Sequence, residues 1–175
     1  MPYMPVPITL PDMAPGSPLA AALLALNNTH AAELSWLDDA KLRQLVTASF
    51  LACRIGEADA MLLTFDQAAA YNSPNFLWFR ARLPRFVYID RIVVAQAARG
   101  RGHASRLYRH LFAQARAAGH TSLVCEVNID PPNPGSDAFH AAFGFTEIGT
   151  VTIHGGAKTV RYLLRQLADT AAPER

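Results

Sequence analysis

The stretch "VVAQAARGRGHASRL" (residues 93–107) places two glycines and three arginines between a pair of valines and a run that could form a helix. Gly100 and Gly102 let a ligand come close to the backbone, because glycine has no side chain and tolerates a positive φ. Free amide groups and the helix dipole favour an anion at the first turn of a helix. Positive charge is added by three arginines, Arg99, Arg101 and Arg106. The stretch therefore predicts a site for a phosphate-bearing ligand.

Two common nucleotide-binding motifs fit this stretch poorly. A P-loop requires a lysine directly after its second conserved glycine, and no lysine follows here. A dinucleotide fingerprint has three glycines, of which "GRGHAS" supplies only the first two. The fingerprint usually occurs early in a doubly wound domain. Here the strand before it ends near residue 95, and the chain is too short to complete a full doubly wound sheet.

Two carboxylates lie inside apolar runs, Asp90 in "VYIDRIV" and Glu126 in "LVCEVNI". Burial disfavours the charged form of a carboxyl group and raises its pKa, which suits a general base for an amine. Each carboxylate could instead pair with a nearby arginine or accept a backbone amide. Both residues are therefore candidate catalytic bases.

A strand–helix–strand unit positions these residues. "FVYIDRIVV" (86–94) is rich in β-branched and aromatic residues, which predicts a buried strand. Residues 103–118 have apolar side chains at helical spacing, and Gly119 is a natural stop. "TSLVCEVNI" (121–129) predicts a second buried strand. Together they form one βαβ unit with parallel strands, and the glycine-rich turn opens its helix.

The chain before this unit is less regular. Residues 1–18 are rich in proline and predict an extended arm. The apolar run 19–26 fits either a short strand or the end of a helix, whereas the N-cap types at 27–29 predict that a helix follows. Ser35 with Asp38 resembles a capping box that opens a further helix.

The remaining segments complete a mixed α/β pattern. Residues 50–66 predict an antiparallel hairpin, and 67–86 show no clean period and predict a long irregular segment. After the βαβ unit, 136–143 predict a short helix and 146–167 a second hairpin. Residues 168–175 are predicted to be a frayed tail.

The composition indicates a folded, soluble protein of one domain. The chain has 175 residues, of which 51% are hydrophobic and 17% charged. A net charge of +2 is too small to indicate nucleic acid or an anionic membrane as a partner. Cys53 and Cys125 lie in apolar runs, which favours buried thiols in a reducing compartment. No signal peptide or membrane span is recognised, so we expect a cytoplasmic location.

Two motifs resemble those of the GNAT superfamily of N-acetyltransferases. The turn matches its acyl-CoA-binding signature [Q/R]-x-x-G-x-[G/A], here Arg99, Gly102 and Ala104, after a strand that ends in Val94. Downstream, "NPGSDAFHAAFGF" is similar to the family's N-x-x-[A/S]-x-x-F-Y-x-x-x-G-F, at the positions Asn133, Ser136, Phe139, His140, Gly144 and Phe145. Gln96 stands where the family frequently has proline, and His140 stands where it usually has tyrosine.

The resemblance implies a fold, a cosubstrate and a reaction. The fold is a single GNAT-like α/β (α+β) domain over residues 19–167, with a mixed central sheet, splayed parallel strands and flanking helices. The cosubstrate is acetyl-CoA, whose acetyl group is attacked directly by an amine. The residues implied in cofactor binding are Ile92, Val93, Val94, Arg99, Gly100, Arg101, Gly102, His103, Ala104, Asn133 and Phe139. For catalysis, the resemblance implies His140 as a donor to the leaving thiolate and no metal. One of the two carboxylates in apolar runs, Asp90 or Glu126, would act as the base. Tyr108 faces the core on the helical count and is a weak alternative donor.

Other functions stay open at this stage. A catalytically silent CoA-binding or CoA-sensing module would keep the fold, and His140 in the usual tyrosine position keeps that alternative in view. The aromatic and basic stretch "NFLWFRARLPRF" is also compatible with stacking on nucleic acid, although packing in the core is the simpler interpretation. The acceptor, a small-molecule or peptide amine, is not identified by the sequence, and a homodimer is compatible with it.

Overall fold

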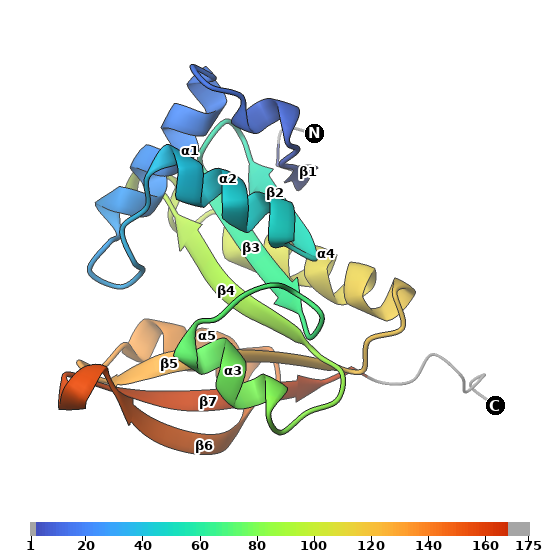
Figure 1. Cartoon of the computed structure of the whole chain (residues 1–175), viewed down its shortest axis with the longest axis vertical. Helices are drawn as coiled ribbons and strands as arrows, with labels where there is room; N and C mark the ends of the chain where they lie inside the picture. Colours follow the sequence, from blue (N-terminus) through green and yellow to red (C-terminus); the bar gives the residue numbers. More distant parts are fainter. Residues whose placement is uncertain (1–2, 168–175) are drawn as a thin grey trace.

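The computed structural model describes residues 3–167, which form a seven-stranded mixed sheet with helices on both faces (Figure 1). The predicted tail at 168–175 lies outside the described residues. The strands, in the spatial order β1-β2-β3-β4-β5-β7-β6, are β1 (Val6–Pro7), β2 (Leu51–Ile55), β3 (Ala60–Asp66), β4 (Val87–Val94), β5 (Ser122–Asp130), β7 (Lys158–Gln166) and β6 (Thr146–Ile153). The α-helices are α1 (Pro18–Thr29), α2 (Asp39–Ala48), α3 (Pro74–Arg80), α4 (His103–Ala117) and α5 (Pro134–Ala142).

The two central strands β4 and β5 are parallel and diverge soon after they start. Their pairing is limited to Val87 with Leu123 and Tyr88 with Val124. Next to this pairing, β4 carries a bulge, since Asp90 has no partner in the register with β3. A bulge bends its strand and increases the local twist. The strands therefore open into a gap, which is visible in Figure 1, and the predicted fold class with splayed parallel strands is confirmed.

Two hydrophobic clusters lie on opposite faces of the sheet. One cluster joins α1, α2 and α3 to the sheet and contains Leu23, Leu45 and Phe76. The other joins α4 to the opposite face and contains Leu107 and Leu111. The partly buried side chains of α5 pack against this second cluster. The strands β2, β3, β4, β5 and β7 contribute to both clusters because successive side chains point to opposite faces. The gap between β4 and β5 is consequently open to both layers of helices.

The amino-terminal region differs from the sequence expectation. The run 19–26 is helical, and α1 ends at Thr29 where a helix was predicted to begin. The Ser17 side chain accepts the Ala20 amide, and Pro18 occupies the first helical position. A serine N-cap followed by proline is a stronger start signal than the asparagines further on. Before this helix, β1 pairs with β2 at the edge of the sheet.

Two further corrections concern helix boundaries. The capping-box assignment was wrong, because Asp38 is itself the N-cap of α2 and accepts the Lys41 amide at 2.7 Å. The segment 67–86 contains α3, which again begins at a serine–proline pair. Three phenylalanines of this region are fully buried, Phe76, Phe79 and Phe86. These aromatic rings serve the core, so they are not available for stacking on nucleic acid.

Candidate active site

The glycine-rich turn has the geometry of an anion site. Gly100 and Gly102 have φ values of 76° and 75°, and Gly102 precedes the 15-residue helix α4 without a side-chain cap. Within the described residues, the backbone amides of 100–105 donate to no acceptor. A Cβ atom added to Gly100 would meet no atom within 4 Å, so the space over the turn is open. The amides therefore face room for a ligand.

Charged side chains of the turn support its conformation. The Arg106 guanidinium donates to the carbonyl of Arg101 at 2.6 Å, and it lies 3.3 Å from Nδ1 of His103. The His103 side chain is buried, and its Nε2 has no hydrogen-bond partner among the described residues. Buried polar atoms are normally paired, so this nitrogen is available to a ligand group. The Arg99 guanidinium lies 3.1 Å from Nε2 of His30.

The turn opens into a cavity of about 590 Å³, which we call the turn cavity. Nine of the residues that the sequence implied for cofactor binding line it, namely Ile92, Val94, Arg99, Gly100, Gly102, His103, Ala104, Asn133 and Phe139. Val93 does not, because its side chain is buried in the cluster on the other face of β4. Arg101 does not line the cavity either, and its carbonyl accepts a hydrogen bond from the Arg106 guanidinium.

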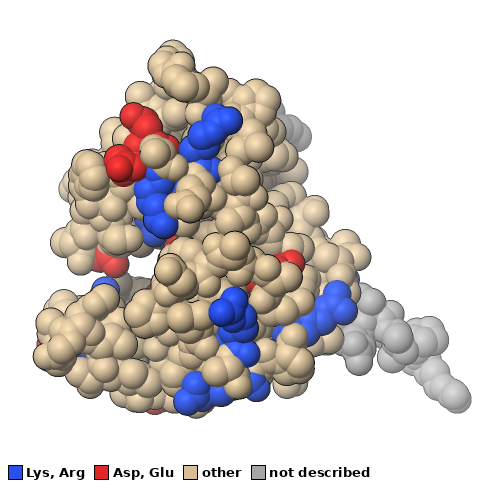
Figure 2. Space-filling view, in the orientation of Figure 1, with Lys and Arg blue, Asp and Glu red and all other residues tan. Residues whose placement is uncertain are grey.

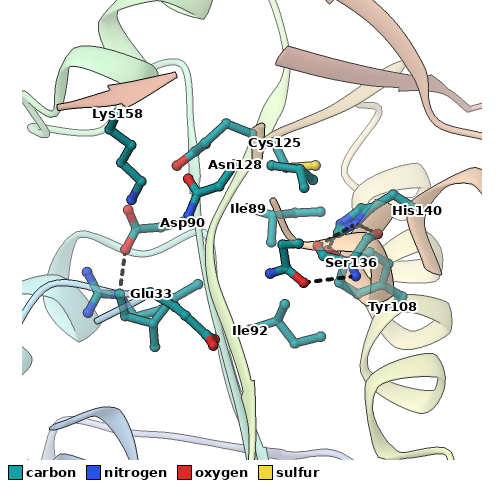
Figure 3. Close-up of a pocket in the computed structure, with 15 residues that line it drawn as sticks. Glu33, Ile89, Asp90, Ile92, Tyr108, Cys125, Asn128, Ser136, His140 and Lys158 are labelled. Atoms are coloured by element: carbon teal, nitrogen blue, oxygen red, sulfur yellow. Dashed lines mark hydrogen bonds and ion pairs between the residues drawn. The ribbon is translucent and has the colours of Figure 1, made fainter. Parts of the chain in front are cut away.

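A second, smaller cavity of about 120 Å³ occupies the opening between β4 and β5, and we call it the gap cavity. The residues that line both cavities are Glu33, Ile92, Asn133, Ser136 and His140, so the two cavities adjoin each other. The space-filling view shows the molecule hollowed between the α1–α2 layer and the β5–β7 layer (Figure 2). In the close-up, Glu33, Asp90 and Lys158 lie on one side of β4, whereas Tyr108, Ser136 and His140 lie on the other side (Figure 3).

Glu126 is the most strongly perturbed carboxyl group of the gap cavity. Tyr88 donates its hydroxyl to both carboxylate oxygens at 2.9 and 2.8 Å, and Asn75 donates to one of them at 2.9 Å. The Tyr162 hydroxyl in turn donates a hydrogen bond to the side-chain oxygen of Asn75 at 2.8 Å. Desolvation by burial outweighs these hydrogen bonds and raises the Glu126 pKa to about 7. Glu126 can therefore take up and release a proton near neutral pH.

Asp90 is the other carboxylate predicted from the sequence, and its negative charge is compensated by an ion pair with Arg91. Arg91 donates its Nε–H to one carboxylate oxygen at 2.7 Å, and Tyr71 donates to the other. Both charged side chains of this ion pair are 5% exposed. Arg91 also donates to Asn27 at 2.8 Å, which ties β4 to α1. Asp90 therefore has the surroundings of a structural ion pair more than those of a free base.

His140 contacts Tyr108, which the sequence indicated only as a weak alternative donor. Its Nε2 lies 2.7 Å from the hydroxyl of Tyr108, and its Nδ1 lies 2.8 Å from the carbonyl of Ser136. Both side chains are nearly inaccessible to solvent, at 4% for His140 and 0% for Tyr108. Burial lowers the pKa of His140 and raises that of Tyr108 well above 10.

Several residues that line or support the gap cavity were missed by sequence reasoning. Glu33 and Lys158 reach it from the α1–α2 loop and from β7, and Asn75 supports Glu126 from α3. None of the three belongs to a motif, and 51 positions separate Asn75 from Glu126. Tyr108 had a usable signal, since it shares the apolar stripe of its helix and carries a hydroxyl that needs a partner when buried.

Comparison with known proteins assigns the family. The model of the acetyltransferase (GNAT) family matches residues 30–145, which include the turn, both central strands and α5. The chain belongs to this family. The resemblance proposed from the two motifs is thereby confirmed, and acetyl-CoA is confirmed as the cosubstrate at the level of the family. Among proteins with curated functions, none matches the sequence.

Solved structures share the fold at low sequence identity. Ard1 from Thermoplasma volcanium has a TM-score of 0.71 at 13% identity, over 96% of this chain and 99% of its own. The yncA protein from Salmonella typhimurium, solved with its cofactor acetyl-CoA, has a TM-score of 0.69 at 19% identity, over 98% of both chains. An N-acetyltransferase from Staphylococcus aureus Mu50 has a TM-score of 0.66 at 17% identity, over 95% of this chain and 99% of its own.

Membrane spans were sought among the helices of residues 3–167. None of these helices has both the length and the apolar character that crossing a membrane requires.

Proposed function

We propose that this protein transfers the acetyl group of acetyl-CoA to an amine. The observation that carries the proposal is that the two cavities adjoin each other and share five lining residues. One end is the turn with its free amides, and the other end is the buried carboxyl group of Glu126. A long ligand held at the turn by its phosphates can therefore extend along β4 and deliver a reactive group into the gap.

In this proposal the pyrophosphate of CoA binds the amides of the turn. An anion is favoured there by unpaired N–H groups, the dipole of α4 and the arginines nearby. The pantetheine arm follows β4 past Val94 and Ile92, which line the turn cavity. The thioester then lies between the diverging strands, where β4 and β5 no longer pair with each other. The protein thus holds both reactants in position for a direct attack.

Glu126 is the proposed base for the amine. A group with a pKa of about 7 is half ionised at neutral pH, which is close to the optimum for proton transfer. Its carboxylate accepts a proton from the incoming ammonium, and the neutral amine attacks the carbonyl carbon of the thioester. The C–S bond then breaks, and its electron pair stays on the CoA sulfur. The acetylated nitrogen still carries an extra proton, which passes to Glu126 after the first proton has left Glu126 for solvent.

The transfer is expected to be direct, because the nearest thiol is a poor nucleophile. Cys125 lines the gap cavity, but burial raises its pKa well above the usual value for a thiol. The thiolate is the reactive form of cysteine. We expect Cys125→Ala to change kcat by less than about threefold, as measured by thiol release from acetyl-CoA.

Cys53→Ala is the matched control, since Cys53 is also buried but lies away from both cavities. Comparable rates for the two variants and the wild type support direct transfer. An acetylated enzyme that is detected by mass spectrometry in the wild type and is missing in Cys125→Ala would contradict it.

A catalytically silent CoA-binding module is the alternative, and turnover separates the two. The wild-type protein is incubated with acetyl-CoA and a panel of amino acids, small amines and peptide amino termini. The proposal predicts that at least one amine causes thiol release together with an equal amount of acetylated product. Binding of acetyl-CoA in calorimetry without acetylation of any amine would favour the silent module.

A further inference from the structure

We infer that the hydroxyl of Tyr108, positioned by His140, is the hydrogen-bond donor to the leaving thiolate of CoA. The inference rests on the proposed function, and it assigns to α4 a role that the sequence suggested for His140 itself. Both residues line the gap cavity on the face of the sheet opposite to Asp90 (Figure 3). Glu126 lies on the same face as Asp90, because it accepts the hydroxyl of Tyr88, which belongs to the cluster that does not contain Tyr108. The base and the thiolate donor thus approach the thioester from opposite faces of the sheet.

The hydrogen bonds of His140 fix its tautomer. A carbonyl oxygen can only accept, so the contact at 2.8 Å from Nδ1 to the Ser136 carbonyl places a hydrogen on Nδ1. Burial lowers the pKa of His140, so the ring is neutral and Nε2 carries a lone pair. This lone pair accepts the hydroxyl hydrogen of Tyr108 at 2.7 Å. Neither nitrogen of His140 therefore has a hydrogen to offer to a ligand in the cavity.

Of the polar hydrogens on Tyr108 and His140, only the hydroxyl hydrogen of Tyr108 can turn toward the cavity. Rotation about the bond between ring and oxygen moves it from Nε2 of His140 toward a sulfur atom in the gap. Tyr108 lies on α4, which is anchored by apolar contacts, so the oxygen itself stays in place. His140 holds the hydroxyl in the resting state and is a positioning residue.

The donor stabilises the thiolate without giving up its proton. Burial raises the pKa of Tyr108 well above 10, whereas a thiol has a pKa of about 8.5. CoA therefore leaves as a thiolate that accepts a hydrogen bond, and the two protons lost by the amine leave one after the other through Glu126. Other ionisable groups facing the pair are Cys125 and Glu126 on β5, and Asp137 on α5. The negative charge of ionised Glu126 disfavours a nearby thiolate. The wild type and its variants must therefore be compared at the same pH.

Binding of CoA tests the inference without requiring turnover. Calorimetry at pH 7 and pH 9 measures CoA and, as a reference, an analogue that lacks the sulfur atom. In the wild type, the affinity for CoA relative to the reference should be about tenfold higher at pH 9 than at pH 7. The reason is that the thiolate formed at the higher pH accepts a hydrogen bond, and a hydrogen bond to a charged group is strong. Tyr108→Phe should lose this gain and bind the reference normally. His140→Phe should keep a part of it, because the hydroxyl remains.

Turnover provides the second readout. Tyr108→Phe should lower kcat about 100-fold with little change in the KM for acetyl-CoA. His140→Phe should have a smaller effect, and the double variant should be no slower than Tyr108→Phe, because His140 acts through Tyr108. Melting temperatures close to that of the wild type show that the buried pair still packs.

Several outcomes overturn the inference. A full pH-dependent gain in Tyr108→Phe would remove the tyrosine from its role. Loss of the gain in His140→Phe alone would make the histidine the donor. A wild type that binds CoA but acetylates no amine refutes the proposed function, and the binding comparison still decides on Tyr108. A wild type that does not bind CoA refutes both.

Discussion

Glu126→Gln should lower kcat about 100-fold to 10,000-fold at pH 7, because the variant keeps the shape of the side chain but has no base for the amine. In the wild type the rate should rise as pH increases through about 7, since only ionised Glu126 accepts a proton. The variant should lose this rise and follow the ionisation of the acceptor alone. Initial rates of thiol release between pH 6 and pH 9 measure both effects.

Asp90→Asn is the matched control for the base. Its carboxylate pairs with the buried guanidinium of Arg91, so the substitution removes a charge from the same cavity. It should lower the melting temperature, because a buried charge loses its partner, and leave the pH profile of the rate in place. If Asp90→Asn loses the pH dependence and Glu126→Gln retains it, the two roles are reversed.

The stability of Glu126→Gln provides an independent check with a definite sign. The folded pKa of about 7 exceeds the ordinary value of 4.5, so the folded protein binds a proton more tightly than the unfolded chain. The contribution of Glu126 to stability is therefore present below pH 4.5 and is lost as pH rises through about 7. At pH 8 the variant should be at least as stable as the wild type, as measured by urea unfolding. A clearly less stable variant would indicate a structural role.

Gly102→Val should weaken acetyl-CoA binding at least tenfold, which corresponds to about 1.4 kcal/mol. Gly102 has a φ of 75°, which a β-branched residue rarely adopts, and its amide belongs to the unpaired set at the turn. The added side chain also enters the space that the proposal gives to the pyrophosphate. Calorimetry on the wild type and the variant measures the loss.

Gly16→Val separates this effect from backbone strain. Gly16 has a φ of 80° and open space around its Cβ position, but it lies before α1 and lines neither cavity. Both variants should lose similar stability, and Gly16→Val should bind acetyl-CoA like the wild type. Equal affinities for Gly102→Val and the wild type would show that CoA does not bind at the turn.

The sequence was most informative where several local signals agreed. The strand, the two glycines and the amphipathic helix from His103 onward predicted one βαβ unit, and the structure contains it. The sequence left a strand and the end of a helix open for 19–26, because the start signal of α1 is the pair Ser17–Pro18 while the asparagines at its end suggested a beginning. A local pattern can identify a cap residue without showing which end of a helix it occupies.

The candidate site was predictable for residues within motifs and for the two carboxylates inside apolar strands. The residues of the turn lie consecutively in the chain, so their spacing is visible in the sequence. The different surroundings of Asp90 and Glu126 were only partly visible. Arg91, which pairs with Asp90, is its neighbour in the chain, whereas Asn75 reaches Glu126 from a helix 51 positions earlier. Such partners depend on long-range packing, which periodicity and composition do not encode.

A crystal structure of the protein with CoA and an acetylated amine tests the central claim most directly. Electron density is expected for the pyrophosphate on the amides of 100–105 and for the sulfur in the gap between β4 and β5. The amine should lie on the side of Glu126, and the Tyr108 hydroxyl should face the sulfur. A pyrophosphate bound away from the turn, or a sulfur outside the gap, would contradict the proposed function.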